Sequence, residues 1–221
     1  AIIGAEAGNV TAISVSDERI TEAWQAYYGN VSGAITLDDA NNVTFYDWSL
    51  PDPTGEIYAS NESIVIWSNI YCMNVSNTRN VSGPEGASVN PGSSNNRYGI
   101  NASHLELKFG INATDRDGLN ETFNATYADS TGFRVGATTI DSTDACSMAQ
   151  LYDDQVQDTN WQELLLSDNR SIIFTAILRA NADMYKTAGT ETADFQMLVL
   201  ENGHAGSEAV GINYYFFVEL A

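Results

Sequence analysis

Short runs of β-branched and aromatic residues recur along the chain, separated by stretches rich in Gly, Asn, Ser and Pro. This pattern predicts strands joined by turns, as in a β-sandwich or a barrel. Apolar and charged side chains alternate over residues 105–109, which predicts a strand with one buried face. The predicted strands lie near residues 10–16, 33–37, 43–48, 63–67, 70–73, 104–109, 121–127, 133–140, 171–178, 194–200 and 213–220.

Helix is expected to be scarce. A short helical turn is predicted near residues 159–166, and residues 21–27 fit either a helix or the start of a strand. The 221 residues suit one large domain. We therefore predict an all-β fold with a single β-sandwich, jelly-roll or Ig-like, over residues 17–221, preceded by an N-terminal strand extension over residues 1–16.

One segment differs in composition from the rest of the chain. Of the 26 residues from 74 to 99, 17 are Asn, Ser, Gly or Pro. Loops this long inside a compact domain are usually functional or mobile. Because apolar strand patterns continue on both sides, we predict a long exposed loop at residues 74–99 rather than a linker.

The charge is strongly negative, with nine Lys and Arg against 29 Asp and Glu, a net charge of −20. A phosphate backbone would be repelled by such a chain, so nucleic acid is excluded as a partner. Uncharged polarity comes from Asn, Ser and Thr. This composition is typical of secreted cell-surface proteins and of proteins from salty habitats, and composition alone does not separate the two.

The chain starts with Ala1 and Ile2 rather than Met and contains no apolar run of about 18 residues. These features predict a mature secreted protein without a membrane span, although a shortened chain would start in the same way. The sequence has two cysteines, Cys72 and Cys146, and in a secreted protein the simplest prediction is one disulfide between them. Two buried free thiols are the alternative.

The strongest signal in the sequence is the pattern Asn-x-Ser/Thr, the acceptor for N-linked sugar. It occurs at eleven of 21 asparagines, whereas chance pairing predicts about three or four. An Asn- and Thr-rich chain could also generate such patterns by accident. The predicted acceptors are Asn9, Asn30, Asn42, Asn61, Asn74, Asn80, Asn101, Asn112, Asn120, Asn124 and Asn169.

Ten of the eleven acceptors lie in residues 9–124. Since a glycan cannot coat a surface that packs against protein, we expect the N-terminal half to face solvent. The C-terminal half is then expected to supply much of the core or the contacts between subunits.

Catalytic motifs are absent from the sequence, which has only two histidines, His104 and His204. No nucleophile elbow, phosphate-binding loop or zinc helix is present. No catalytic residue is therefore predicted, and the protein is not expected to be an enzyme. A carboxylate pair for glycoside hydrolysis stays open, because 29 acidic residues always allow some pair at a suitable distance.

Calcium is the one inorganic ligand that the sequence suggests. Asp115, Asp117 and Asn120 place oxygen atoms around Gly118, as a hard cation requires. The same residues also form a common hairpin turn, and the later Glu of an EF-hand is missing. No other cofactor is predicted apart from the N-linked glycans.

The motifs that carry a family resemblance span nearly the whole chain. They are residues 24–33 (WQAYYGNVSG), 35–39 (ITLDD), 42–48 (NVTFYDW), 165–169 (LLSDN), 194–199 (DFQMLV), 201–204 (ENGH) and 214–220 (YYFFVEL). Together they resemble a family of secreted archaeal surface proteins, which implies a cell-surface location but no particular chemistry. The architecture and sugar load are also similar, more loosely, to extracellular filament subunits joined by donor-strand exchange.

The sequence thus predicts an extracellular, cell-surface protein: the structural subunit of an N-glycosylated archaeal filament or pilus. Its expected partners are copies of itself in a helical homopolymer. Residues near 1–16 would complete a neighbour's sheet. The expected inter-subunit residues are Ala1, Ile2, Ile3, Ala5 and Ala7. A surface-layer or sheath protein, or a glycan-binding adhesin, is the alternative.

Overall fold

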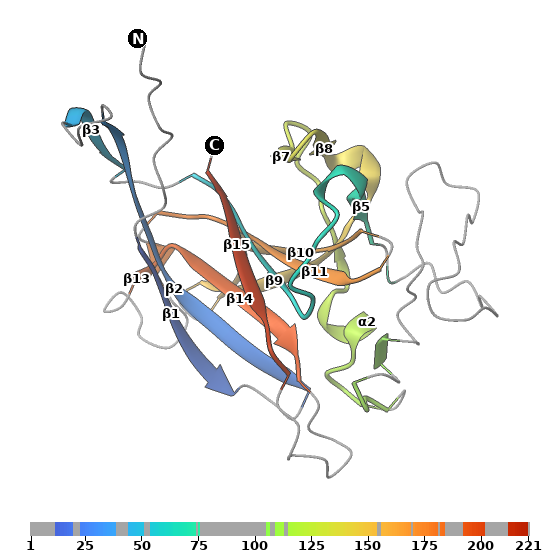
Figure 1. The fold of residues 1–221 in the computed structure, drawn as a ribbon. Coiled ribbons are helices and arrows are strands. Elements are labelled where there is room, and N and C mark those ends of the chain that lie inside the picture. Colours follow the sequence, from blue (N-terminus) through green and yellow to red (C-terminus); the bar gives the residue numbers. More distant parts are fainter. Residues whose placement is uncertain are drawn as a thin grey trace.

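The computed structural model describes residues 12–19, 23–38, 44–50, 54–73, 75, 105–106, 109–112, 115–153, 156–168, 170–180, 182–183, 192–201 and 212–220. They confirm an all-β fold in which antiparallel sheets pack together as a sandwich (Figure 1). None of the helices in this part of the chain has the length and apolar character needed to cross a bilayer.

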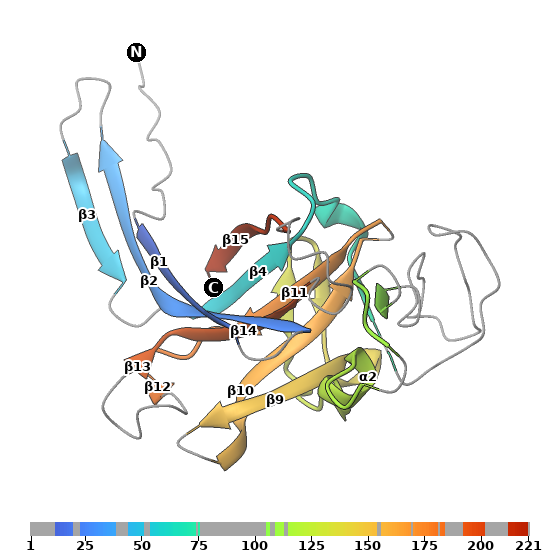
Figure 2. The same ribbon diagram turned by 90° about the horizontal axis from the view of Figure 1, so that it is seen from below.

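The smaller sheet is organised around one long strand, β2. Along its first half, β2 (Trp24–Asp38) pairs with β1 (Ala12–Arg19) on one side and β14 (Phe195–Leu200) on the other. Its second half pairs with β3 (Thr44–Leu50). Figure 2 shows this β2–β3 hairpin extending beyond the body of the sandwich.

The larger sheet has the strand order β15–β4–β11–β10–β9–β6, and β5 pairs with the end of β10. Every neighbouring pair is antiparallel. The strands are β4 (Gly55–Ser60), β5 (Tyr71–Cys72), β6 (Ala125–Thr126), β9 (Ser147–Asp153), β10 (Val156–Ser167), β11 (Ile172–Ile177) and β15 (Tyr215–Leu220).

The main core fills the space between the two sheets. Trp24 of β2 is buried there and packs against Phe123 and Phe174, with ring centroids 5.7 and 6.4 Å away. The indole N–H of Trp24 donates a hydrogen bond to the carbonyl oxygen of Asp117. The polar end of this large side chain is therefore satisfied, as burial requires.

A second core covers the opposite face of the larger sheet. Leu164, Leu166 and Ile173 of that sheet pack with residues from the hairpin of β7 (Phe133–Val135) and β8 (Thr138–Ile140). Two short 3-10 helices, η1 (Trp67–Asn69) and η2 (Ser142–Asp144), lie in the segments that complete this layer. The central strands are thus buried on both faces, which fits the apolar sequence of β11 and of the three leucines near the end of β10.

Several predicted strands are confirmed. The predictions for residues 171–178, 194–200 and 213–220 correspond to β11, β14 and β15. Those for residues 33–37 and 43–48 correspond to the second half of β2 and to β3, and that for residues 70–73 to β5.

The predicted helical turn at residues 159–166 is wrong, because these residues lie within β10. The consecutive leucines Leu164, Leu165 and Leu166 mislead the sequence interpretation. Their side chains alternate between the two cores, so a strand buried on both faces lacks the polar positions that normally reveal it.

The strand predicted at residues 104–109 is also wrong. Leu105 and Glu106 are helical, and the N–H of Phe109 donates to the carbonyl oxygen of Leu105 at 2.9 Å. Leu105 and Phe109 are both buried, and a spacing of four residues places them on one face of a helical turn. Apolar residues at 105, 107 and 109 favour a strand, whereas 105 and 109 taken alone also fit a helical turn.

Three other predicted strands differ from the structure. Residues 121–127 contain the end of the helix α2 (Leu119–Thr122) followed by β6, and residues 133–140 fold into the β7–β8 hairpin. Gly136 makes that turn with a positive φ of 57°. Residues 63–67 have no strand pairing, while β4 and β9 are strands that the sequence interpretation missed.

Part of the predicted N-terminal extension lies in the smaller sheet. Residues 12–16 pair with residues 28–32 of β2 in the same chain. Residues 1–11 of the predicted extension lie outside the described residues. The predicted loop at residues 74–99 lies outside the described residues, apart from the buried Val75.

Candidate functional site

The predicted disulfide is confirmed. Cys72 of β5 is bonded to Cys146, which immediately precedes β9, and both residues are buried in the second core. Main-chain hydrogen bonds support the link on either side: Met73 N–H donates to Leu165, and Ser147 N–H donates to Met73. The disulfide therefore joins two segments, 74 residues apart, that flank the same end of β10.

The described glycan acceptors differ in exposure. Asn30, Asn112 and Asn124 are exposed, whereas Asn61 and Asn120 are half-buried. The amide of Asn124 donates to the carbonyl oxygen of Glu121 at 3.0 Å. The other acceptors lie outside the described residues: Asn9, Asn42, Asn74, Asn80, Asn101 and Asn169.

Asn120 is the acceptor that we expect to carry the least sugar. Its Oδ1 atom is buried and has no hydrogen-bond partner, so attaching a bulky glycan to this amide would require local rearrangement. Glycopeptide mass spectrometry of protein from its native cells should find high occupancy at Asn30, Asn112 and Asn124 and low occupancy at Asn120. Equal occupancy at all four would contradict this expectation.

Two of the three candidate calcium ligands, Asp115 and Asp117, accept hydrogen bonds within the protein. Asp115 Oδ2 accepts from the N–H of Asn112 at 2.8 Å, and the main-chain carbonyl of Asp117 accepts from Trp24. No group of three or more His, Cys, Asp or Glu suited to a metal occurs in the described part of the chain. These bonds account for the shape of the turn, and calcium at Asp115, Asp117 and Asn120 stays a prediction.

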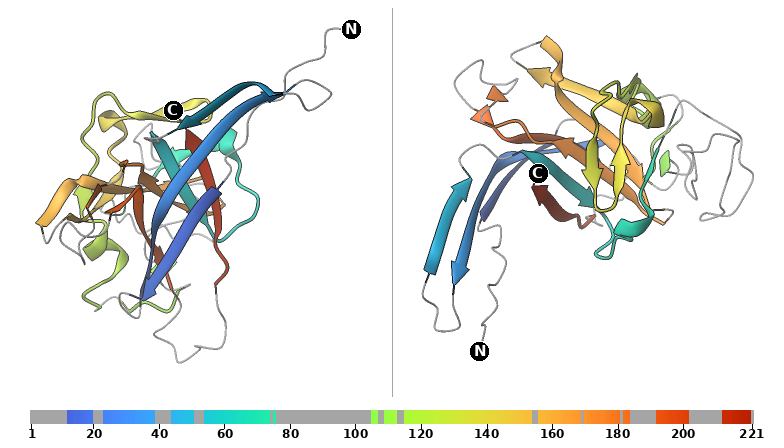
Figure 3. Two further views of the ribbon diagram at one scale, coloured as in Figure 1. Left: turned by 90° about the vertical axis from the view of Figure 1, so that its left-hand side faces the viewer. Right: turned by 90° about the horizontal axis from the view of Figure 1, so that it is seen from above.

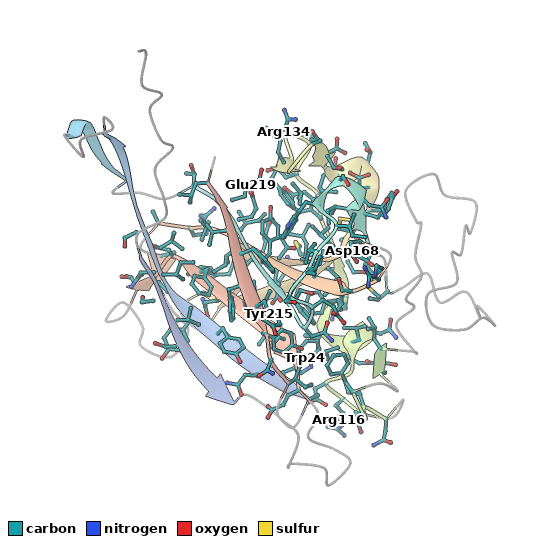
Figure 4. The ribbon with its side chains drawn as sticks, viewed as in Figure 1. Trp24, Arg116, Arg134, Asp168, Tyr215 and Glu219 are labelled. Atoms are coloured by element: carbon teal, nitrogen blue, oxygen red, sulfur yellow. A yellow bond between two sulfur atoms is a disulfide. The ribbon has the colours of Figure 1, made fainter. Side chains whose placement is uncertain are left out.

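Asp168 is a buried carboxylate that sequence analysis missed. Its Oδ1 accepts from the N–H groups of Arg170 and Ser171 and from the Ser171 hydroxyl, at 2.8–3.0 Å. Its Oδ2 accepts from the N–H of Ile66 at 2.9 Å. Burial alone would raise the pKa of Asp168, but these hydrogen bonds outweigh burial and lower it. Asp168 thus ties the β10–β11 turn to the segment that enters η1 (Figure 4).

Glu163 is a second buried carboxyl, on the face of β10 that points into the main core. Its Oε2 accepts from the N–H of Leu198 at 2.7 Å, while Oε1 has no partner. Burial raises the pKa of Glu163 well above its usual range, although the bond from Leu198 opposes that shift. The only sequence signal was a charged residue directly before three leucines.

The edge strand β15 of the larger sheet is the remaining candidate site. β15 pairs with β4 on one side, and no other described strand pairs with its second side. It nevertheless carries Tyr215, Phe216, Phe217, Val218 and Leu220, an unusually apolar set for an edge strand. Edge strands with this composition are sites at which another strand can add.

Half-buried apolar residues of the main core gather beside this edge. We call Ile13 of β1, Tyr27 of β2 and Phe216, Val218 and Leu220 of β15 the β1–β15 seam; all five pack against the main core without being fully enclosed. Tyr27 and Phe216 meet across the two sheets with ring centroids 5.1 Å apart. The left view of Figure 3 shows β1 and β15 bordering the same side of the sandwich.

The predicted inter-subunit residues Ala1, Ile2, Ile3, Ala5 and Ala7 lie outside the described residues, as do His104 and His204. The structure therefore describes the edge strand β15 but none of the predicted inter-subunit residues. Comparisons with protein families, with curated proteins and with solved structures found no match to this chain.

Proposed function

We propose that this protein is the structural subunit of an extracellular archaeal filament, N-glycosylated and assembled by strand addition between copies. The observation that carries the proposal is the β1–β15 seam beside the open edge of β15. An added strand would extend the larger sheet by main-chain hydrogen bonds and would cover Phe216, Val218 and Leu220. The proposed occupant is the segment of a second copy that precedes β1.

The sequence of that segment suits the seam. In an extended strand alternate residues share a face, so Ala1, Ile3, Ala5 and Ala7 would form an apolar face. The opposite face would contain Ile2, Gly4 and Glu6. Small apolar side chains suit an acceptor that is already partly filled by aromatic residues, because they add contact without overpacking.

The geometry of such a contact also explains why a polymer would form. A donor segment and an acceptor edge are different surfaces of one subunit, so their contact is heterologous and repeats from copy to copy. Exposed acceptors such as Asn30 and Asn112 would keep sugar on the remaining surface, and the charge of −20 would disfavour unspecific association. The resemblance to secreted archaeal surface proteins supports the extracellular location.

Deleting residues 1–7 should leave a folded protein that no longer polymerises. Ile3→Asp, which places a charge on the apolar face, should have the same effect, whereas Glu6→Gln on the other face should polymerise normally. Electron microscopy and sedimentation measure assembly, and far-UV circular dichroism measures folding. Fibres formed by the truncated protein would overturn the proposal, and planar lattices of the intact protein would favour a surface-layer role.

A synthetic peptide of residues 1–11 locates the acceptor. Added to the truncated protein, it should slow hydrogen exchange of the amides in residues 215–220, because β15 would gain a second hydrogen-bonded neighbour. Protection that appears on β3 instead would keep strand addition but reject the seam as the acceptor. A peptide with the Ile3→Asp substitution is the matched control and should give no protection.

A further inference from the structure

Two glutamates lie directly opposite each other where the C-terminal strand joins the sandwich. In the antiparallel register of β4 and β15, Glu219 pairs with Glu56, and Phe217 pairs with Tyr58. Paired residues point to the same face, with Cβ atoms roughly 4.5–5.5 Å apart. Two ionised carboxylates in this position repel each other and oppose the strand pairing.

The surroundings of the two carboxyl groups differ. Glu219 is half-buried, and its Oε2 accepts from the Tyr58 hydroxyl at 3.3 Å and from the N–H of Gly136, in the β7–β8 turn, at 3.0 Å. Glu56 is only 5% exposed, so burial and the facing charge of Glu219 both disfavour its ionised form. A largely buried carboxyl group binds its proton more tightly than a solvated one does.

Within the described part of the chain, no cation contributes to the shift in the pKa of Glu56. Burial first, and then the charge of Glu219, raises the pKa of Glu56 to about 7. Tyr58 and Tyr127 are the other titratable groups that bear on this site, and burial is the main cause that raises the pKa of each. On the neighbouring strand β11, Ile177 is the residue paired with Glu56. Arg134, on the β7–β8 hairpin that covers this face, is exposed to solvent (Figure 4).

We propose that Glu56 and Glu219 form a cross-strand carboxyl pair that holds β15 against β4 while Glu56 is protonated, and that loss of this proton loosens β15. With one proton, the pair has a single negative charge, and the two side chains do not repel each other. Without it, two negative charges face each other at a partly buried site. We call this pair the β15 latch.

β15 is the element that would respond. β4 is held on both sides, by β11 and by β15, whereas β15 has β4 as its only described neighbour. Repulsion between Glu56 and Glu219 is therefore relieved at least cost by opening the edge strand. The inference does not depend on assembly, although β15 is also the acceptor edge of the proposed function.

The sign of the pH dependence follows from the raised pKa. When β15 opens, Glu56 becomes solvated and its pKa returns toward about 4.3. The closed state thus binds the proton more tightly than the open state does. Opening becomes progressively easier as the pH rises from about 4.5 to about 7, and it levels off above that range.

Hydrogen exchange measured from pH 5 to pH 8.5 and corrected for the intrinsic exchange rate tests the latch. Protection of the amides in residues 215–220 should fall at least tenfold between pH 5 and pH 7 and then level off. Amides of β11, residues 172–177, serve as the internal reference and should change much less. Ionisation of the buried Glu163 should destabilise the whole fold and should therefore lower protection in β11 as well as in β15. A change confined to β15 is thus due to the latch.

Three variants complete the test. Glu56→Gln should keep β15 protected at every pH, because the neutral amide does not repel Glu219. Glu219→Gln should reduce the pH dependence by removing the opposing charge. Glu62→Gln, at an exposed carboxylate just beyond β4, should behave like the unaltered protein. If the unaltered protein and Glu56→Gln show the same pH dependence at β15, or if neither shows any, the latch is wrong.

Discussion

Replacing Asp168 with alanine should lower the free energy of unfolding by about 3–5 kcal/mol, a large effect for one side chain. Three N–H groups and one hydroxyl donate to this carboxylate, which is completely buried. Alanine would leave those donors without an acceptor in a site that water does not reach. The melting temperature should fall by roughly 10 °C in thermal unfolding followed by circular dichroism.

Two further variants define the cause. Asp168→Asn keeps one oxygen for the Arg170 and Ser171 donors but turns an NH2 group toward the N–H of Ile66, so it should lose about 1–3 kcal/mol. Asp129→Ala removes an exposed carboxylate that accepts from the N–H of Thr131, and it should lose less than about 1 kcal/mol. Equal losses for Asp168→Ala and Asp129→Ala would show that the buried bonds contribute little.

The lowered pKa of Asp168 adds a pH signature. A carboxyl group whose pKa is lower in the folded protein stabilises the fold fully above its unfolded pKa of about 3.9. That stabilisation is lost as the pH falls below this value toward the folded pKa. The difference in stability between the unaltered protein and Asp168→Ala should therefore shrink in acid and stay constant from about pH 5 to pH 8.

Local sequence patterns determine some strands of this fold, whereas others depend on pairing between distant parts of the chain. Strands such as β11, β14 and β15 were predictable because β-branched and aromatic runs stand between turn residues. β10 was not, because burial of both faces removes the alternation on which the prediction relies. The helical turn that joins Leu105 and Phe109 was not predictable either, because the apolar residues at 105, 107 and 109 alternate as they do in a strand.

Some features of the candidate site were likewise predictable from local sequence, and others depended on long-range pairing. The pairing of Cys72 with Cys146 followed from there being only two cysteines, and the glycan acceptors followed from a three-residue pattern. The opposition of Glu56 and Glu219 could not be predicted, because it depends on the register between strands 163 residues apart. Glu56 also lies in β4, a fully buried strand that sequence analysis missed.

The acidic composition has a different meaning once the fold is known. From the sequence alone, all 29 acidic residues are expected to belong to one solvated, negatively charged surface. Glu56, Glu163 and Asp168 are instead buried. Glu56 faces the carboxyl group of Glu219, Glu163 accepts one main-chain hydrogen bond, and Asp168 accepts several hydrogen bonds. Raised pKa values at the first two and a lowered one at the third should give opposite pH dependences.

Replacing both cysteines, as Cys72→Ala with Cys146→Ala, should lower the free energy of unfolding by about 3–5 kcal/mol. The disulfide closes a loop of 74 residues, and the unfolded chain gains conformational freedom when the link is removed. Alanine also leaves a small void among the buried residues of the second core, which adds to the loss. Urea unfolding at neutral pH measures the effect.

The matched measurement is reduction of the unaltered protein, which breaks the same link while leaving both sulfur atoms in the core. The reduced protein should be destabilised slightly less than the double variant, and the difference reports the packing contribution of the sulfurs. Loosening should concentrate on β5 and β9, because the disulfide joins the segments that contain them, and their amides should lose protection before those of β14. A loss below about 1 kcal/mol in both cases would show that the segment between the cysteines stays constrained even in the unfolded chain.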